Sequence, residues 1–509
     1  MKNIDLLFQE DAGRINEDYL ADMGLEYIAD ILEPELCAAF LSVIGVPLKC
    51  REKILERQNI LKDFLEHPGL ALTVQKICLE IQGNKCASTY ADKRKRLPDF
   101  QKALERSMDI SGELLKHLSH RNFSSGTLKD LRSQLDCGGK FKSIKKRVAG
   151  LVEASMSDDL TLDIEYGSGF KFRGANIYAN NKSNNKSNDV NAKEGGTINN
   201  IVKLFKNNIN LKKEPEGFFY AAPYSPVYSQ IHGEAGILIK TAVYTGMIIY
   251  DLNRHILNFC NTLAKHLNFY IACIEIIKYL EDKNIDTVFP ELRGGDKGDN
   301  ERNGRNERKI STENLLDFGL IIKDKENIVS NDFEDTGGAY YLISGENQGG
   351  KTTFLKSLGI AQLFAQAGMK VTAGKYVCPV FNNFFSHFPK DEDEDLNFGK
   401  LAEELTRISR ASHMIADNSL ALFNESFATT TENEGFEIAC GIMRAFSETD
   451  AKILLVTHNY PLLKKRGELN LANNIKVKSL VVNGRTYKIT EGEPRENLDA
   501  VDFLKNFTK

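Results

Sequence analysis

The chain has 509 residues, more than a single hydrophobic core usually holds, so we expect about two to four domains. Its 42% hydrophobic and 27% charged residues are typical of a soluble globular protein, and the formal net charge of -4 excludes a globally basic surface for nucleic acid. Any nucleic acid would have to meet a local basic surface or a clamp. The nine cysteines form no C-x-x-C pair, which argues against a zinc knuckle and for a reducing compartment. Because neither a signal-peptide core nor a long apolar run is present, we expect a cytoplasmic protein without a membrane partner.

The first part of the chain is predicted to be mostly helical. Over residues 1–150, apolar side chains recur at helical spacing while charged residues fill the other positions. Residues 160–180 alternate in the manner of strands. The Asn-, Lys- and Ser-rich repeat within 180–197 cannot bury apolar surface, so we expect a disordered loop there. Residues 237–280 again carry apolar side chains at helical spacing.

These patterns divide the chain into three parts. Residues 1–292 are predicted to form a helical lever or core region that includes the polar loop. Residues 293–309 are rich in Gly, Arg and Asn and are predicted to be a linker. Residues 310–509 are predicted to form an α/β nucleotide-binding domain, because apolar strands alternate there with helical patterns.

The most informative segment is Gly-Glu-Asn-Gln-Gly-Gly-Lys-Thr at residues 345–352, which fits the phosphate-loop pattern G-x-x-x-x-G-K-[ST]. An apolar strand at 339–343 precedes it, and a helical pattern follows it as far as Gly368. A strand, a Gly-rich loop and a helix aim backbone N–H groups and the positive helix end at one point, which predicts a di- or triphosphate site. The alternative is a chance match in a Gly-rich turn, and the flanking strand and helix argue against it.

The loop predicts ATP and Mg²⁺ as ligands. Lys351 is expected to be a surface charge that reaches the outer phosphates, and the Thr352 hydroxyl is expected to ligate Mg²⁺. The other loop residues expected to bind the nucleotide are Gly345, Glu346, Asn347, Gln348, Gly349, Gly350 and Thr353.

Two further apolar strands end in polar residues downstream of the loop. Residues 419–423 lead to Asn424 and Glu425, and residues 452–456 lead to His458. Asn424 takes the place of the usual Mg²⁺-holding Asp, while Glu425 is placed to orient or activate the attacking water. A His at the end of a neighbouring parallel strand can reach the γ-phosphate or Glu425. Alone, His458 would be an ordinary loop histidine; three elements in this order favour the catalytic role.

Gly399 and Lys400 lie between these motifs. Because Leu405 and Ile408 share one helical face, Gly399 and Lys400 are predicted to stand at a helix N-terminus, which favours anions. This arrangement resembles the signature segment of ABC-type ATPases, which contacts nucleotide bound to the opposite subunit. A solvated start of a helix is an equally good interpretation.

Together the motifs resemble the MutS family of DNA-associated ATPases. The matching segments are Gly-Glu-Asn-Gln-Gly-Gly-Lys-Thr-Thr-Phe-Leu-Lys-Ser-Leu-Gly (345–359), Leu-Phe-Ala-Gln-Ala-Gly-Met-Lys-Val-Thr-Ala (363–373), Leu-Phe-Asn-Glu-Ser-Phe-Ala-Thr-Thr (422–430) and Val-Thr-His-Asn (456–459). The resemblance is strong over residues 330–465 and faint over 1–290. The Asn-x-Gly-Gly-Lys arrangement is narrower than a general phosphate loop.

The resemblance implies an ATPase that binds DNA, acts in repair or recombination, and works as a homodimer gated by ATP. It implies that Glu425 is the catalytic carboxylate, that His458 senses the γ-phosphate, and that Ile328 and Val329 pack on adenine. The chain departs from the family at Asn424, which leaves slow hydrolysis as an expectation. It also lacks the family's mismatch-reading domain and a nuclease module in its sequence, so a divergent short member is expected.

A second class of function stays open at this point. A nucleotide-gated module could act on a protein or a ribosome without binding DNA, and the net charge of -4 favours this interpretation. The family resemblance favours the DNA-binding ATPase. A small-molecule kinase is disfavoured because no motif for an acceptor substrate is found.

Overall fold

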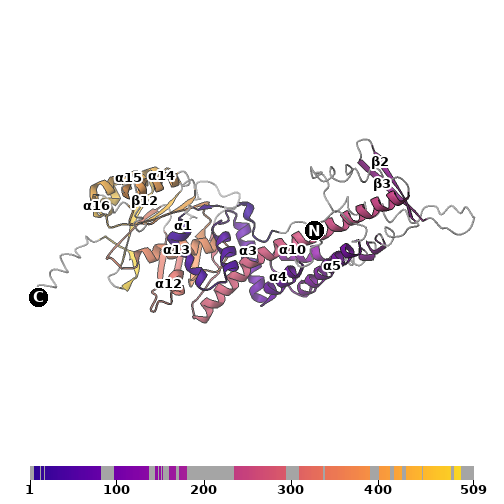
Figure 1. Ribbon diagram of the computed structural model, residues 1–509. Coiled ribbons are helices and arrows are strands. Elements are labelled where there is room, and N and C mark those ends of the chain that lie inside the picture. Colours follow the sequence, from indigo (N-terminus) through magenta and orange to yellow (C-terminus); the bar gives the residue numbers. More distant parts are fainter. Residues whose placement is uncertain are drawn as a thin grey trace, which may run out of the picture. The chain divides into compact units, whose positions relative to one another are not determined.

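The computed structural model divides the chain into two compact units (Figure 1). Unit 1 consists of residues 1–4, 73–121 and 130–264, and unit 2 consists of residues 5–72, 122–129 and 265–509. The residues that the structure describes are 5–11, 13–15, 18–81, 97–136, 144–146, 148–150, 152, 160–167, 171–179, 234–293, 309–335, 339–389, 400–412, 418–426, 431–449, 451–469, 471–482 and 486–494. The polar loop expected at 180–197, most of the expected linker and Gly399 lie outside them.

Unit 1 is mainly helical, as the apolar spacing predicts. It is built from α5 (Leu97–Ser119), most of α4 (Leu70–Glu80) and α6 (Gly126–Leu135), and the first part of α10 (Glu234–Asp282). Every third or fourth residue of α5 is buried, and Ser107 on this helix donates a hydrogen bond of 2.5 Å to Asn253 on α10. Two antiparallel strands, β2 (Leu160–Gly167) and β3 (Lys171–Ala179), form a hairpin where the sequence predicts strands.

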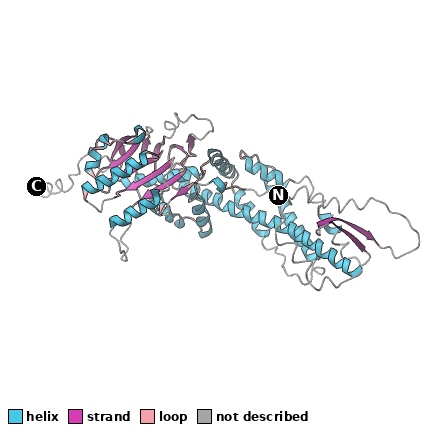
Figure 2. Ribbon diagram, turned by 90° about the horizontal axis from the view of Figure 1, so that it is seen from above, coloured by secondary structure: helices cyan, strands magenta, loops and turns pink. Residues whose placement is uncertain are grey.

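Unit 2 contains a seven-stranded sheet that is parallel except for its last strand. The strand order is β1 (Arg14–Ile15), β9 (Asn383–His387), β10 (Ser419–Asn424), β11 (Lys452–Val456), β7 (Ala339–Ser344), β12 (Lys476–Val482) and β13 (Ile489–Glu491). Helices flank these strands (Figure 2). Figure 1 shows α13 (Lys351–Gln366) on one face and α15 (Glu432–Ser447) and α16 (Tyr460–Lys464) on the other. Coverage of both faces explains why β10 and β11 are buried at every position.

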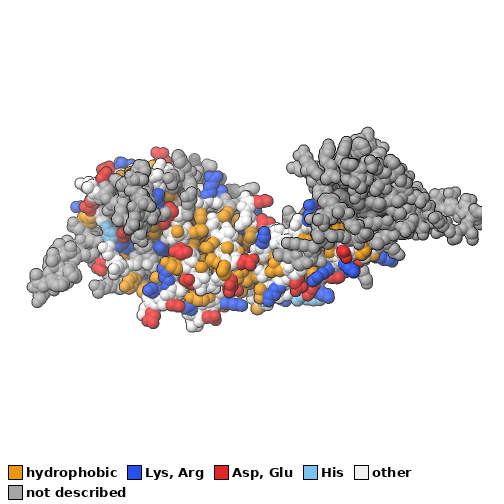
Figure 3. All heavy atoms as spheres, viewed as in Figure 1, with side chains coloured by type: hydrophobic (Ala, Val, Ile, Leu, Met, Phe, Trp, Pro, Cys, Tyr) orange, Lys and Arg blue, Asp and Glu red, His pale blue; other side chains and the backbone are white. Residues whose placement is uncertain are grey.

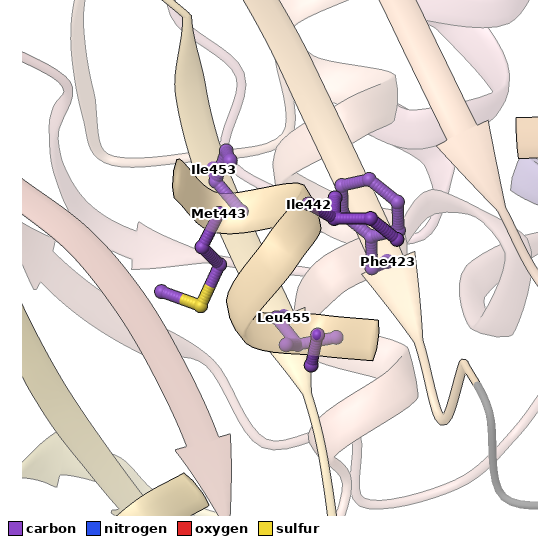
Figure 4. A pocket seen from close by; sticks show the side chains of 6 residues that line it. Phe423, Ile442, Met443, Ile453 and Leu455 are labelled. Atoms are coloured by element: carbon purple, nitrogen blue, oxygen red, sulfur yellow. The ribbon is translucent and has the colours of Figure 1, made fainter. Parts of the chain in front are cut away.

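The core between the sheet and α15 contains a small apolar void (Figure 4). All the side chains that line it are hydrophobic: Phe423, Ala439, Ile442, Met443, Ile453 and Leu455. Because no polar group points into the void to orient a ligand, it is a packing gap of the core rather than a place for chemistry.

The remaining elements of unit 2 surround this sheet. A second, four-stranded sheet has the order β4 (Glu291–Arg293), β8 (Lys375–Pro379), β5 (Ser311–Leu315) and β6 (Asn331–Glu334). The helices are α1 (Tyr19–Met23), α2 (Pro34–Ile44), α3 (Arg51–Glu66), α12 (Phe318–Ile322) and α14 (Lys400–Ser412). The protein is therefore a mixture of helix and sheet, as expected. None of the helices in the described part of the chain has the length and hydropathy needed to cross a membrane.

Residues near the N-terminus belong to the unit that carries the sheet. The strand β1 pairs in parallel with β9 at the sheet edge. Farther along, the buried amide of Gln366 on α13 donates to the carbonyl oxygens of Leu48 at 2.7 Å and Phe381 at 2.8 Å. These contacts join the connection between α2 and α3 to the helix that follows the phosphate loop. The linker predicted at residues 293–309, between a helical region and a nucleotide-binding domain, stays a prediction.

Candidate nucleotide site

The phosphate loop connects β7 to α13 in the way that the sequence predicts. Gly350 is the N-cap of α13 and has φ 92°, and Gly345 has φ 138°, a backbone conformation that residues with a side chain rarely adopt. A Cβ atom at Gly345 would also lie 2.9 Å from the Cβ of Val482 on β12. Glycine is therefore required at the start of the loop, which leads into the N-terminus of the 16-residue helix α13, a position that favours an anion.

Lys351 is buried and points back into the loop. Its side chain is 4% exposed, and its Nζ donates hydrogen bonds to the carbonyl oxygens of Gly345 at 3.0 Å and Glu346 at 2.9 Å. The expectation that Lys351 is a surface charge is therefore wrong. The loop wraps around the ammonium group, and its carbonyl oxygens hold the charge where a phosphate would approach the helix N-terminus.

The ends of three adjacent parallel strands meet beside this loop. In the register of the sheet, Asn424 on β10 pairs with Val456 on β11, and Val456 pairs with Ile343 on β7. The hydroxyl of Thr352 donates a hydrogen bond of 2.8 Å to Oδ1 of Asn424. The two residues expected to hold Mg²⁺, which are far apart in the sequence, therefore touch each other.

The donor set fits a magnesium ion that arrives with a nucleotide. Thr352 and Asn424 offer neutral oxygen atoms, which suit a hard cation that keeps several waters and binds phosphate oxygens. Within the described part of the chain, no cluster of three or more His, Cys, Asp or Glu side chains could hold a metal by itself. The protein therefore supplies no dedicated cage there, and phosphate oxygens would have to complete the coordination.

Glu425 and His458 lie together at the ends of β10 and β11. Glu425 Oε1 and His458 Nε2 are 3.3 Å apart. Their hydrogen bond lowers the pKa of Glu425 against the opposing effect of burial, and the positive charge of Lys351 acts in the same direction. Glu425 is thus an ionised hydrogen-bond acceptor with weakened basicity. Such a group suits the orientation of a water molecule more than full removal of its proton.

The backbone of Glu425 is held in an unusual conformation. Its φ is 48°, and its N–H donates a hydrogen bond of 2.9 Å to the carbonyl oxygen of Val456. A non-glycine residue in this region is strained by about 1–3 kcal/mol and persists only where its surroundings hold it. Strain at a residue that carries a carboxylate between two strand ends is typical of a functional site.

Tyr487 lies beside the phosphate loop, which the sequence does not reveal. It is 47% exposed, and a Cβ atom at Gly350 would lie 3.5 Å from its ring. Its carbonyl oxygen accepts from Asn331 Nδ2 at 3.2 Å, and the next residue, Lys488, donates to the carbonyl oxygen of Ser330 at 2.5 Å. The half-buried Ile328 and Val329, expected to pack on adenine, immediately precede these partners. A single aromatic residue in a polar turn gives no periodic signal.

The remaining expected site residues are only partly described. The helix α14 begins at Lys400, where the sequence predicts a helix N-terminus. Gly399 and the side chain of Lys400 lie outside the described residues. Leu405 is exposed at 39%, whereas Ile408, expected on the same face, is buried in the core beside β10.

Comparison with known proteins identifies the domain that carries this site. Residues 341–497 match the family model of MutS domain V. This part of the chain, which carries the site, is therefore similar to MutS domain V. The family resemblance predicted from the phosphate loop and the strand ends is therefore confirmed.

The similar curated proteins cover the MutS domain V and little else. An Endonuclease MutS2 of Bacillus velezensis is 32% identical over 178 residues, which is 33% of this chain and 22% of that protein. Two others, from Streptococcus agalactiae and Streptococcus pyogenes, are each 34% identical over 172 residues, again 33% of this chain and 22% of the relative. The chain thus matches about a fifth of the length of these relatives.

Proposed function

We propose that this chain is a Mg²⁺-dependent ATPase of the MutS type. The observation that carries the proposal is the convergence of the phosphate loop with the Glu425–His458 pair, 3.3 Å apart, at the ends of adjacent strands. Thr352 and Asn424 join the two sides of the site through their 2.8 Å hydrogen bond. Phosphoryl transfer to water needs a helix N-terminus, an amine, a carboxylate and a histidine, and these groups meet at the carboxyl ends of the parallel strands.

Each group has a role in this proposal. The N–H groups at the start of α13 and the ammonium of Lys351 bind the outer phosphates. The carboxylate of Glu425 accepts a hydrogen bond from a water molecule whose oxygen attacks the γ-phosphorus, while the bond to the β-phosphate oxygen breaks and ADP leaves. His458 keeps Glu425 ionised and is proposed to contact the γ-phosphate. Thr352 and Asn424 would hold Mg²⁺, which would neutralise phosphate charge.

The base of the nucleotide is proposed to lie between two segments. Ile328 and Val329 offer half-buried apolar side chains on one side, and the exposed ring of Tyr487 offers an aromatic face on the other. The hydrogen bonds between residues 330–331 and 487–489 hold these segments together beside Gly350. Stacking on an aromatic ring is a common way to bind a purine without reading its edge.

The proposed biological role is that of a cytoplasmic homodimer that uses ATP to act on DNA in repair or recombination. The match of residues 341–497 to MutS domain V supports it. In the proposed dimer, Gly399 and Lys400 at the start of α14 contact nucleotide bound to the other subunit, because a helix N-terminus favours anions. ATP would then favour dimerisation by binding the state in which both contacts exist.

A module that acts on protein or ribosome without DNA is the second candidate. Acidic and basic side chains are interspersed over the described atoms of the face in Figure 3, and the formal net charge is -4. This distribution favours a partner less negative than duplex DNA. The two candidates share the ATPase site and differ in what the ATP cycle acts upon.

The decisive experiment measures ATP turnover with duplex, mismatched and branched DNA at several salt concentrations. Stimulation by DNA that falls steeply with salt would support the DNA-acting ATPase, because phosphate contacts release counterions. Turnover without any DNA response or salt-dependent gel shift would favour the interaction module. No turnover at all would contradict the ATPase proposal.

Glu425→Gln provides the matched variant for the catalytic role and for assembly. We expect it to bind ATP with nearly unchanged affinity and to turn it over at least about a hundredfold more slowly, because the carboxylate acts only after binding. Sedimentation of this variant should show a dimer with ATP and less dimer without it, and Lys400→Glu should weaken the ATP-bound dimer. A monomer at micromolar concentration under both conditions would contradict the composite-site dimer.

A further inference from the structure

A buried histidine lies beside the residue that follows Glu425. His387 is the last residue of β9, it is 0% exposed, and β9 is the parallel neighbour of β10 on the side away from β11. His387 Nδ1 and Ser426 Oγ are 2.8 Å apart and share a hydrogen bond. Phe423 is the register partner of His387, so the bond reaches past the strand end to the turn that carries Glu425.

This hydrogen bond completes the support of the turn formed by residues 424–426. On the β11 side, the N–H of Glu425 donates to Val456, and its carboxylate meets His458. On the β9 side, the bond between His387 and Ser426 holds the turn. Because Glu425 has φ 48°, its position depends on contacts that hold the turn from both sides.

The end of β9 is itself held by charged and polar groups. Arg407 on α14 donates from Nη1 to the carbonyl oxygen of Phe388 at 3.0 Å and forms an ion pair with Asp18 at 3.0 Å. The hydroxyl of Ser386 donates to the buried carboxylate of Asp22 at 2.6 Å. His387 therefore projects from a fixed strand end, which makes it suited to fix its neighbour.

The surroundings also keep the imidazole neutral. Burial, followed by the positive charge of Arg407, lowers the pKa of His387 to about 4. A neutral imidazole presents one donor and one acceptor, and either tautomer can form the bond between Nδ1 and the serine hydroxyl. The hydrogen bond is thus available throughout the neutral pH range.

We propose that His387 is a positioning residue for the ATPase reaction: it acts through Ser426 to hold the Glu425 carboxylate where the attacking water must lie. The inference rests on the proposed function, because it assigns a role within that reaction. A small shift of the Glu425 carboxylate would still permit ATP binding but would orient the attacking water poorly. Loss of the His387–Ser426 hydrogen bond is therefore expected to lower kcat and to leave ATP affinity unchanged.

The test uses variants that separate hydrogen bonding from packing. His387→Asn places a polar atom where Nδ1 stands, whereas His387→Leu removes that atom. Ser426→Ala removes the partner oxygen with little change in volume. We expect Ser426→Ala and His387→Leu to lower kcat about ten- to a hundredfold with ATP affinity within about twofold of the original. His387→Asn should keep kcat within about threefold.

A double variant tests whether the two residues act as one unit. His387→Leu combined with Ser426→Ala should be no slower than the slower single variant, because each change removes the same hydrogen bond. Multiplied effects, unchanged kcat in Ser426→Ala, or losses of ATP affinity equal to the losses of kcat would each overturn the positioning role. If His387→Leu does not fold, Ser426→Ala and His387→Asn decide the matter.

The same measurements separate this inference from the proposed function. If the original protein does not hydrolyse ATP, or if Glu425→Gln is as active as the original, the ATPase proposal fails and the role of His387 fails with it. If Glu425→Gln is slow and Ser426→Ala is not, only the positioning role fails.

Discussion

Replacement of Lys351 by Ala tests the phosphate site most directly. The residue is 4% exposed, and the change removes an ammonium group that donates to two loop carbonyl oxygens. A charge-assisted contact with phosphate contributes about 1.5–3 kcal/mol, so Lys351→Ala should weaken ATP binding about 10- to 150-fold. Turnover at subsaturating ATP should fall by at least the same factor.

The structure also predicts a moderate loss of stability. The carbonyl oxygens of Gly345 and Glu346 lose their donor, and an unsatisfied buried acceptor costs about 1–3 kcal/mol. Glu346 is exposed and Gly345 is only half-buried, so water can replace much of the lost bonding. We therefore expect a cost near 1 kcal/mol, with the fold retained.

Titration with a fluorescent ATP analogue and thermal melting without nucleotide measure the two effects separately. Lys375→Ala is the matched control, because it removes the same charge from an exposed ion pair with Glu313 elsewhere in unit 2. Unchanged nucleotide affinity in Lys351→Ala would refute the phosphate-site interpretation. Loss of the fold would instead mean that Lys351 acts mainly as a structural residue.

Two further changes test the metal side of the site and a buried acid of the same unit. Asn424→Asp places a carboxylate where the amide oxygen accepts from Thr352. We expect faster turnover and an about tenfold lower Mg²⁺ concentration for half-maximal turnover. Unchanged or slower turnover would mean that the missing charge does not limit hydrolysis. Burial raises the pKa of Asp317 from 3.8 to about 6, so its contribution to stability is full below about pH 4 and is lost as pH rises through 6. Asp317→Asn keeps an oxygen that can accept from the N–H of Leu320. At pH 7.5 it should melt at a higher temperature than the original, which corresponds to a gain of at most about 3 kcal/mol in the free energy of unfolding, and at pH 4 it should show no gain. An equal gain at both pH values would show that ionisation of Asp317 is not the cause.

The sequence predicts those features of the site that depend on residues close to one another in the chain. The spacing of the phosphate loop, the apolar strands before Asn424 and His458, and the helix start at Lys400 each depend on neighbours in sequence. Strand ends can be predicted to meet because parallel strands share one edge. The same reasoning applied to His387, a histidine at the end of an apolar strand, would have placed it beside the site.

Other features depend on sheet order and three-dimensional packing, which no local pattern encodes. Lys351 is buried because the loop folds around it, although a lysine after two glycines looks exposed in sequence. Gln362 and Gln366 look like surface residues of α13, yet both are buried and their amides bond to Pro379, Phe381 and Leu48. The two-residue strand β1 is too short to show any alternation.

The pairing of β1 with β9 has a consequence for how the protein folds during synthesis. Arg14 is the register partner of Asn383, so the edge of the sheet cannot close until the ribosome has added the whole intervening chain. At about 5–20 residues per second this takes roughly 20 to 75 seconds. Throughout that time the buried ring of Tyr19 lacks its edge-to-face partner Phe384 on β9. The nascent N-terminal segment is therefore exposed to chaperones and proteases for longer than most of the sheet that it completes.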